Sequence, residues 1–261
     1  MMLCAHGIHA RIGRKQILRG IDFAARAGEV TAIVGPNGSG KSTLLKAITD
    51  EVEFTGRILL NGQDIARLKP WQLAAMRGVL PQAASLAFPF TVIEVVRMGL
   101  LSGASGMRAD IPLRALAAVG LEGYGGRFYQ ELSGGEQQRA QLARVLCQVW
   151  QPVEDGFPRW LLLDEPVASL DIGHQILVMQ LVRDYATRGG GVVAVMHDLN
   201  LSAMYADQMT MIRDGTVLVS GPPGAVIQND ILSRAYGCKL RVNTAPGQGQ
   251  SYVLPHLACA H

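Results

Sequence analysis

The chain has 261 residues, of which 49% are hydrophobic and 17% are charged. This length predicts one large domain, or one domain that carries an inserted subdomain. The 24 basic residues exceed the 21 acidic residues by three, and this excess is too small to favour nucleic acid as a partner. The cysteines form no C-x-x-C pair, which argues against a zinc ribbon or a redox dithiol.

Residues Met1–His6 do not combine a basic segment with an apolar core, so we expect no signal peptide. No apolar run approaches the about 18 residues that a membrane-spanning helix needs. Any association with a membrane is therefore expected to come through a partner protein.

The apolar pattern predicts strands at both ends of the chain and helices between them. Short apolar runs in residues 1–34 indicate an antiparallel β-layer that leads into a buried strand at Val30–Val34. Residues 90–150 predict helices only, which indicates a helical insertion. The other predicted elements are, in chain order, strand Gly56–Asn61, helix Trp71–Met76, strand Gly78–Pro81, helices Thr91–Met98, Pro112–Val119 and Gly134–Val149, strand Trp160–Leu163, helix Gly173–Arg188, strand Val192–Met196, helix Leu199–Ala206, and a hairpin of Met209–Arg213 with Thr216–Val219.

We predict from this order a single α/β domain over residues 1–261. Its core, with the β-layer, takes residues 1–82 and 151–221, and the helical subdomain takes residues 83–150. Residues 222–261 are expected to form a less regular C-terminal extension, and residues 151–158 a surface loop.

A glycine-rich segment follows the buried strand and matches the phosphate-binding pattern G-x-x-x-x-G-K-[ST]. Glycines let successive N–H groups point inward as an anion-binding nest, and the following helix adds partial positive charge at its N-terminus. Lys41 is predicted to reach the β- and γ-phosphates, and Ser42 to bind Mg²⁺. The predicted nucleotide contacts are Gly35, Pro36, Asn37, Gly38, Ser39, Gly40, Lys41, Ser42 and Thr43.

Three further apolar runs end in residues that suit phosphoryl transfer, namely Gln82, the pair Asp164-Glu165, and His197. If these strands are parallel neighbours, their carboxyl ends bring the side chains to one phosphate. Asp164 would then hold Mg²⁺ through water, and Glu165 would act as the general base on a water molecule. His197 would bridge the γ-phosphate and orient that water, and Gln82 would touch Mg²⁺ or the water. Each residue alone also has an ordinary explanation, such as helix capping.

Residues 132–138 read Leu-Ser-Gly-Gly-Glu-Gln-Gln and open a long predicted helix. Ser133 and Glu136 form a capping-box pattern, so an ordinary helix start explains them. Gly134 and Gly135 are costly in a first helical turn, by roughly 1 kcal/mol each relative to alanine. They would let an anion approach the free N–H groups of the helix start closely.

These motifs in this order resemble the ATP-binding subunit of ABC transporters, over nearly the whole chain. The matching segments are Gly35–Thr43, Gln82, Leu132–Gln138, Leu161–Pro166, Ala168–Asp171 and His197. The resemblance implies a RecA-like P-loop NTPase core with an antiparallel β-layer and an inserted helical subdomain. It also implies a head-to-tail homodimer that binds and hydrolyses MgATP, in which Ser133, Gly134 and Gly135 of one copy cap the γ-phosphate held by Lys41 of the other. Asp171 would lie at the dimer seam.

One position departs from the family pattern. The resemblance implies an aromatic residue that stacks on adenine, and Ile12 stands roughly at that place. An aliphatic side chain packs against a base but does not stack on it as a π-system. The preference for ATP over GTP is therefore open.

The absence of predicted membrane helices, tandem cassettes and long coiled coils leaves two kinds of ABC protein, a separate importer ATPase or a soluble cassette of the iron–sulfur-assembly type. The stretch after Gln82 resembles importers of vitamin B12, ferric siderophores and haem, and implies that Phe88 and Phe90 contact the permease. The same two residues would also suit the core of the subdomain. A regulatory module that binds ATP without hydrolysing it is a third possibility, which an intact Glu165 disfavours.

Residues 151–159 and 197–205 resemble the haemin-import branch of that family most. The resemblance implies an ATPase bound to a permease dimer at the cytoplasmic face of a bacterial inner membrane, served by a periplasmic substrate-binding protein. Ferric siderophore and vitamin B12 are the alternative cargoes. The chain has no C-x-x-C-H motif and no paired axial ligands, so we expect no direct binding of haem.

Overall fold

A computed structural model of the chain describes residues 1–82, 88–102, 108–245, 247, 251 and 253. Residues 83–87, where the predicted helical subdomain begins, lie outside the described residues. The elements are β1 (Met2–Ile12), β2 (Lys15–Arg26), β3 (Val30–Val34), α1 (Lys41–Ile48), β4 (Phe54–Leu60), β5 (Gln63–Asp64), a 3₁₀ turn (Ile65–Arg67), α2 (Pro70–Met76), β6 (Arg77–Leu80), α3 (Val92–Ser102), α4 (Ile111–Ala118), a 3₁₀ turn (Tyr129–Glu131), α5 (Gly134–Gln148), β7 (Val153–Glu154), β8 (Phe157–Pro158), β9 (Trp160–Asp164), α6 (Ile172–Thr187), β10 (Gly191–Val195), α7 (Leu199–Tyr205), β11 (Gln208–Arg213), β12 (Thr216–Gly221), α8 (Pro223–Val226) and α9 (Asn229–Tyr236). Within the described ranges, no helix combines the length and apolarity that crossing a bilayer requires.

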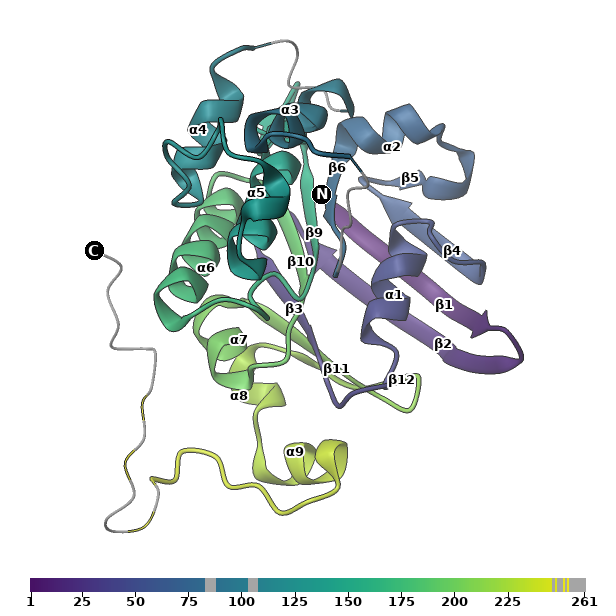
Figure 1. The fold of residues 1–261 in the computed structure, drawn as a ribbon. Coiled ribbons are helices and arrows are strands. Elements are labelled where there is room, and N and C mark those ends of the chain that lie inside the picture. Colours follow the sequence, from purple (N-terminus) through teal and green to yellow (C-terminus); the bar gives the residue numbers. More distant parts are fainter. Residues whose placement is uncertain (83–87, 103–107, 246, 248–250, 252, 254–261) are drawn as a thin grey trace.

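Two sheets organise the molecule (Figure 1). The N-terminal sheet is antiparallel, in the order β2-β1-β4-β5. The larger sheet has the order β12-β11-β3-β10-β9-β6, and its strands from β11 to β6 run parallel. The carboxyl ends of β3, β10, β9 and β6 therefore lie along one edge, as the sequence predicted.

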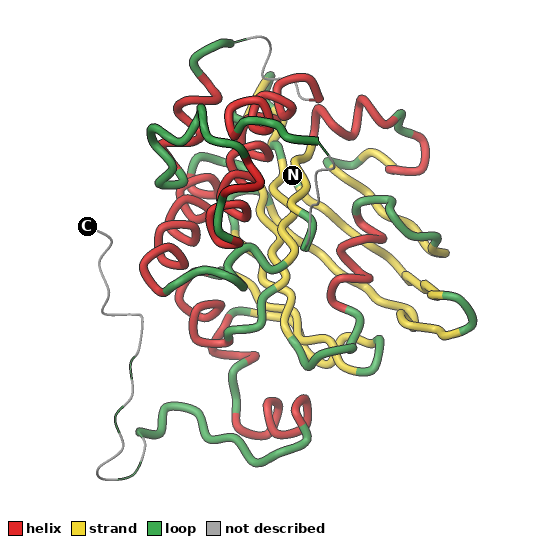
Figure 2. Tube along the Cα trace, viewed as in Figure 1, coloured by secondary structure: helices red, strands yellow, loops and turns green. Residues whose placement is uncertain are grey.

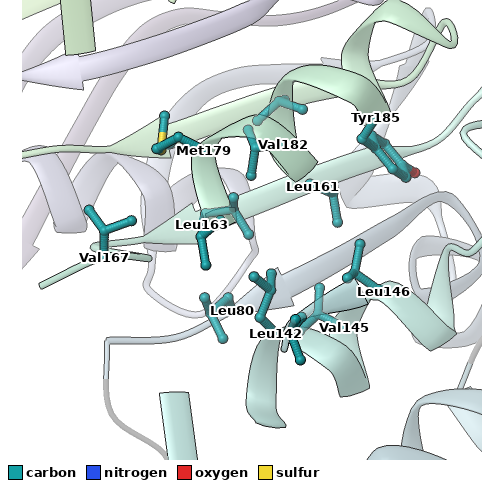
Figure 3. Packing of buried hydrophobic residues seen from close by; sticks show 14 of the residues in the cluster. Leu80, Leu142, Val145, Leu146, Leu161, Leu163, Val167, Met179, Val182 and Tyr185 are labelled. Carbon is teal, nitrogen blue, oxygen red and sulfur yellow. The ribbon is translucent and has the colours of Figure 1, made fainter. Parts of the chain in front are cut away.

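The parallel strands are apolar along their whole length because both faces of their sheet are covered. Alternate residues of β9 face opposite cores, with Leu161 and Leu163 on one side and Trp160 and Leu162 on the other. Figure 3 shows the first of these cores, where side chains of α5 and α6 pack against β9. The second core lies between the parallel sheet, the helix α1 and the antiparallel sheet.

Helices α3, α4 and α5 pack on one another as the predicted helical insertion (Figure 1). The described residues between 90 and 150 contain no strand, as predicted. Figure 2 shows that helices cover the side of the parallel sheet that faces away from the antiparallel sheet. The predicted hairpin of β11 and β12 also forms, with Asp214 and Gly215 in its turn.

Two segments for which the sequence predicted little regular structure contain short elements. Segment 151–158 contains the short hairpin β7–β8, whose turn residues Asp155 and Gly156 both have positive φ, 52° and 78°. Asp-Gly favours this type of tight hairpin turn, so the signal was present in the sequence. The C-terminal extension contains α8 and α9, of four and eight residues, in a segment whose Pro and Gly residues favour turns.

A buried arginine joins the helix that follows the phosphate loop to the edge of the parallel sheet. Arg77 in β6 donates from Nη1 to the Ile48 carbonyl and from Nη2 to the Thr49 carbonyl, both at 2.7 Å. These carbonyls end α1 and have no following turn of helix to bond. Gln148 in α5 donates to the Arg77 carbonyl at 2.9 Å, so the helical subdomain is tied to the same point.

We expect Arg77→Ala to lower the free energy of unfolding by about 3 kcal/mol, because it removes two charge-assisted hydrogen bonds and leaves buried carbonyls unpaired. Urea unfolding measures the change. Arg26→Ala is the matched control, since its side chain is 65% exposed and its ion pair is long at 3.9 Å. That control should change stability by no more than about 0.5 kcal/mol; equal losses in both variants would contradict the role of Arg77.

Candidate functional site

The glycine-rich loop turns sharply between β3 and α1. Gly35 has φ 143°, and a Cβ atom there would meet the Ile212 carbonyl oxygen at 2.1 Å. Gly40 has φ 110°, and a Cβ atom there would meet Leu18 Cδ2 at 2.8 Å. Larger residues are therefore excluded by both backbone strain and space. The two glycines set the path of the loop.

The helix α1 begins at this loop without a side chain over its N-terminus. Its N-cap is Gly40, no side-chain oxygen accepts from the first amides, and its first turn carries no acidic residue. Free N–H groups and the positive end of the helix dipole together favour an anion at this place. The local structure is that of a phosphate site.

Lys41 is the first residue of α1, directly after the loop, and is 5% exposed. Its Nζ donates to the carbonyls of Gly35 at 2.9 Å and Pro36 at 3.1 Å, so it braces the loop. Burial lowers the pKa of this ammonium, and the carboxylates of Glu165 and Asp164 act in the opposite direction. The nearby carboxylates favour the charged form of the ammonium.

Ser42, in the first turn of α1, and Asp164, the last residue of β9, are hydrogen-bonded neighbours. Ser42 Oγ donates to Asp164 Oδ1 at 3.0 Å, although 122 positions separate the two residues. Burial raises the pKa of the Asp164 carboxyl, the Ser42 hydrogen bond lowers it, and the charge of Glu165 raises it. A hydroxyl beside a buried carboxylate is an oxygen donor set that fits a hard divalent cation such as Mg²⁺.

Glu165 directly follows β9 and faces His197, which follows β10. Glu165 Oε1 and His197 Nε2 are 2.5 Å apart. The backbone of Glu165 has φ 54°, a conformation that is unusual for this residue type and is often found at functional sites. Its N–H donates to the Val195 carbonyl at 3.1 Å, which fixes the peptide against β10.

A cleft of about 540 Å³ collects most of the predicted nucleotide contacts on one surface. Ile12 at the end of β1 is 57% exposed and lines the same cleft as the loop. Lys15, which the sequence did not single out, also lines it. The predicted residues that line the cleft are Ile12, Asn37, Gly38, Gly40, Lys41, Ser42, Thr43, Gln82, Glu165 and His197.

The Ser133 helix start does not line this cleft. Ser133 Oγ accepts from Glu136 N at 3.3 Å, and Glu136 Oε2 accepts from Ser133 N at 2.8 Å, so the predicted capping box forms. A Cβ atom on Gly134 would meet nothing within 4 Å, so this backbone is open to approach. Gly135 is closer to its own chain, because a Cβ atom there would meet the Ser169 carbonyl oxygen at 3.1 Å.

Asp171 and Phe88, two further predicted residues, lie on the exposed surface. Asp171 caps α6, accepting from His174 N at 2.9 Å, and this hydrogen bond lowers the pKa of its carboxyl. Phe88 is 68% exposed and meets Phe90 edge to face, with ring centroids 6.4 Å apart. Phe90 also packs against the larger core, so it serves the subdomain as the alternative interpretation expected.

Sequence reasoning assigned no role to Gln138, the side chain that links α5 to Glu165. Gln138 Nε2 donates to the Glu165 carbonyl at 2.7 Å, and its Oε1 accepts from Ser169 N at 3.3 Å. A glutamine inside a helix carries no local signal of a partner 27 positions away. Only its place near the Gly134 helix start could have drawn attention to it.

A cleft at the carboxyl ends of parallel strands, lined by a phosphate loop and Glu165 and with the buried Asp164 bonded to Ser42, defines the chain as a P-loop NTPase. A family model described as ABC transporter matches residues 18–168. The chain therefore belongs to the ABC transporter family, and it is an ATP-binding ATPase of that family. The fold class and the family predicted from the sequence are confirmed.

The similar proteins cover the chain almost completely. The hemin import ATP-binding protein HmuV of Jannaschia sp. (strain CCS1) is 60% identical over 98% of this chain and 95% of that protein. HmuV of Roseobacter denitrificans (strain ATCC 33942 / OCh 114) is 60% identical over 99% of each. Among solved structures, a bacterial Atm1-family ABC exporter with ATP bound has a TM-score of 0.75 at 27% identity, covering 90% of this chain and 42% of that chain.

We expect Asp164→Asn to raise the unfolding temperature of the nucleotide-free protein at pH 7. The folded wild type keeps this carboxyl ionised at a cost there, because burial raises its pKa above the ordinary value of about 3.9. As pH falls, the buried carboxyl takes up its proton before an unfolded one does. The advantage of the variant should therefore shrink as the pH approaches about 4.

Differential scanning fluorimetry at several pH values measures this difference. Asp214→Asn is the matched control, since that side chain is 82% exposed and lies in the β11–β12 turn. The control should show no comparable gain. A lower unfolding temperature for Asp164→Asn at pH 7 would contradict the expectation.

Proposed function

We propose that this chain is the ATP-hydrolysing subunit that powers import of haem through a membrane permease. The near full-length identity of 60% to proteins named for hemin import carries the cargo assignment. The cleft that joins the phosphate loop to Glu165 and His197 carries the assignment of ATP hydrolysis. Haem itself is not expected to touch this chain.

In this proposal the phosphate loop binds the nucleotide phosphates, and Glu165 acts as the general base for ATP hydrolysis. Lys41 and the free amides at the start of α1 neutralise the β- and γ-phosphates. Glu165 takes a proton from the attacking water, and His197, 2.5 Å away, orients that water against the γ-phosphate. Ser42, Asp164 and Gln82 would hold Mg²⁺, which supplies charge neutralisation at the phosphates.

The part of the cleft that would hold the adenine distinguishes nucleotides less well than the part that would hold the phosphates. Ile12 gives apolar contact to the base without aromatic stacking. Phosphate contacts therefore provide most of the affinity for the nucleotide in this proposal.

A second copy of the chain completes the site. Ser133, Gly134 and Gly135 stand on a helix start with free amides, yet they do not line the cleft of their own chain. In a head-to-tail homodimer this helix start meets the γ-phosphate held by the other copy. Asp171, exposed at the start of α6, then lies at the seam between copies.

The permease contact is assigned to the surface around Phe88 and Phe90. Phe90, Leu100 and Leu101 line a groove of about 440 Å³, and Phe88 stands exposed beside it. Apolar grooves of this kind receive helical segments of partner proteins. We place the subunit on the cytoplasmic face of a bacterial inner membrane, bound to a permease dimer that a periplasmic haem-binding protein supplies.

Reconstitution of the subunit with its permease in liposomes tests the assignment. We expect haem-loaded binding protein to stimulate ATP hydrolysis and haem uptake. Glu165→Gln should keep ATP binding but lower kcat by at least about 100-fold, because the water loses its base. Coupled phosphate release and haem absorbance measure the two activities.

ATP hydrolysis that is stimulated by a binding protein loaded with ferric siderophore or vitamin B12, and not by one loaded with haem, would identify that compound as the cargo instead. Co-purification with soluble partners and no permease would favour the soluble iron–sulfur-assembly type instead. Normal turnover by Glu165→Gln would refute the general base.

Mixing two inactive variants tests whether sites are shared between copies. Lys41→Ala removes the phosphate contact, and Ser133→Arg blocks the helix start, so each homodimer should be inactive. A mixed dimer keeps one intact pair, from the loop of one copy and the helix start of the other. An equal mixture should recover about a quarter of wild-type turnover if copies exchange randomly. No recovery despite proven exchange would contradict shared sites.

A further inference from the structure

We propose that Gln138 is a positioning residue for ATP hydrolysis, which ties the peptide of the general base Glu165 to the helix start at Ser133. This inference rests on the proposed function only in taking Glu165 as the base and Ser133 as the contact of the partner's nucleotide. It assigns a role to a side chain that does not line the nucleotide cleft.

The side chain of Gln138 bridges two points of the loop that follows β9. Its Nε2 donates to the Glu165 carbonyl at 2.7 Å, and its Oε1 accepts from the Ser169 N–H at 3.3 Å. One amide thus uses both its donor and its acceptor on the backbone of a single short loop. These two hydrogen bonds fix the loop that follows β9 against the helix α5.

The first of these bonds acts on a peptide in an unusual conformation. Glu165 has φ 54°, and its N–H is held by the Val195 carbonyl at 3.1 Å. Its carbonyl is held by Gln138 and, more weakly, by the Ala168 N–H at 3.3 Å. With both sides of the residue restrained, the carboxylate is aimed at the cleft, where its Oε1 meets His197. Removing the shorter bond frees the strained backbone to relax.

The position of Gln138 on α5 also couples the helix start at Ser133 to the peptide of Glu165. Ser133 is the N-cap of this helix, so Gln138 stands less than two turns behind the helix start. A helix segment of this length moves as one body. When the partner's nucleotide draws the helix start toward itself, Gln138 carries the shift to Glu165 of its own chain. Each composite site therefore adjusts the base of the other site.

The neighbouring Gln137 provides a matched control. It has the same side chain and also donates to two backbone carbonyls, those of Tyr129 at 3.3 Å and Leu132 at 3.1 Å. Both acceptors belong to the helical subdomain itself and neither belongs to the Glu165 loop. The variant Gln137→Ala therefore measures how much kcat and thermal stability change when a glutamine is removed from this part of α5 without affecting the Glu165 loop.

The test compares Gln138→Ala, Gln138→Met and Gln137→Ala by steady-state ATP hydrolysis and thermal unfolding. We expect Gln138→Ala to lower kcat by about 10- to 100-fold, because small displacements of a reacting group cost this much. KM for ATP should stay within about twofold, since the phosphate loop is untouched. Gln138→Met fills the same space without hydrogen bonds and should lose as much kcat as Gln138→Ala. Gln137→Ala should keep kcat within about twofold of wild type.

Recovery of kcat in Gln138→Met would show a packing role and overturn the proposal. Equal kcat losses in Gln138→Ala and Gln137→Ala would overturn it as well, and so would a rise in KM with unchanged kcat. Failure of the proposed cargo is a separate outcome: wild type and Gln137→Ala would then hydrolyse ATP while haem uptake is absent.

Discussion

The parallel pairing of β3, β10 and β9 is the constraint on which the site depends. Val195 pairs with Ile33 on one side and with Asp164 on the other, so all three strands end at the same level. The phosphate loop, the two carboxylates and His197 follow directly from these ends. A slip of one residue would move every side chain of a strand from one core to the other and shift its end, because side chains alternate along a strand. Full burial of both sheet faces fixes the register and, with it, the chemistry.

The same edge collects charges and backbone conformations that oppose folding. Burial disfavours the ionised forms of both Lys41 and Asp164, and the two groups support each other through their opposite charges. Gly35, Gly40 and Glu165 all have positive φ. Sites commonly keep such costs because the arrangement is useful when ligand arrives. Bound phosphate adds the negative charge that Lys41 and the free amides of α1 are placed to meet.

The sequence was sufficient to predict the strand ends and the loop, because apolar runs and the residues after them are local signals. It also predicted the helical insertion and the capping box at Ser133. The bridge from Gln138 and the cap from Arg77 were not predictable, since each joins segments that only the folded chain brings together. The hairpin at Asp155-Gly156 had a readable turn signal, whereas α8 and α9 lie in a segment whose Pro and Gly residues favour turns.

In the proposed homodimer a single copy holds only part of the site. The phosphate loop, Glu165 and Ser42 line the cleft, and Asp164 is hydrogen-bonded to Ser42, whereas Ser133 and the open backbone at Gly134 do not line the cleft. In that proposal the helix start at Ser133 meets the γ-phosphate held by the other copy. Gln138 connects that helix start to the peptide of Glu165 within one chain. In the proposed mechanism, dimer closure and alignment of the base would then occur together, which would link hydrolysis to the motion that a permease needs.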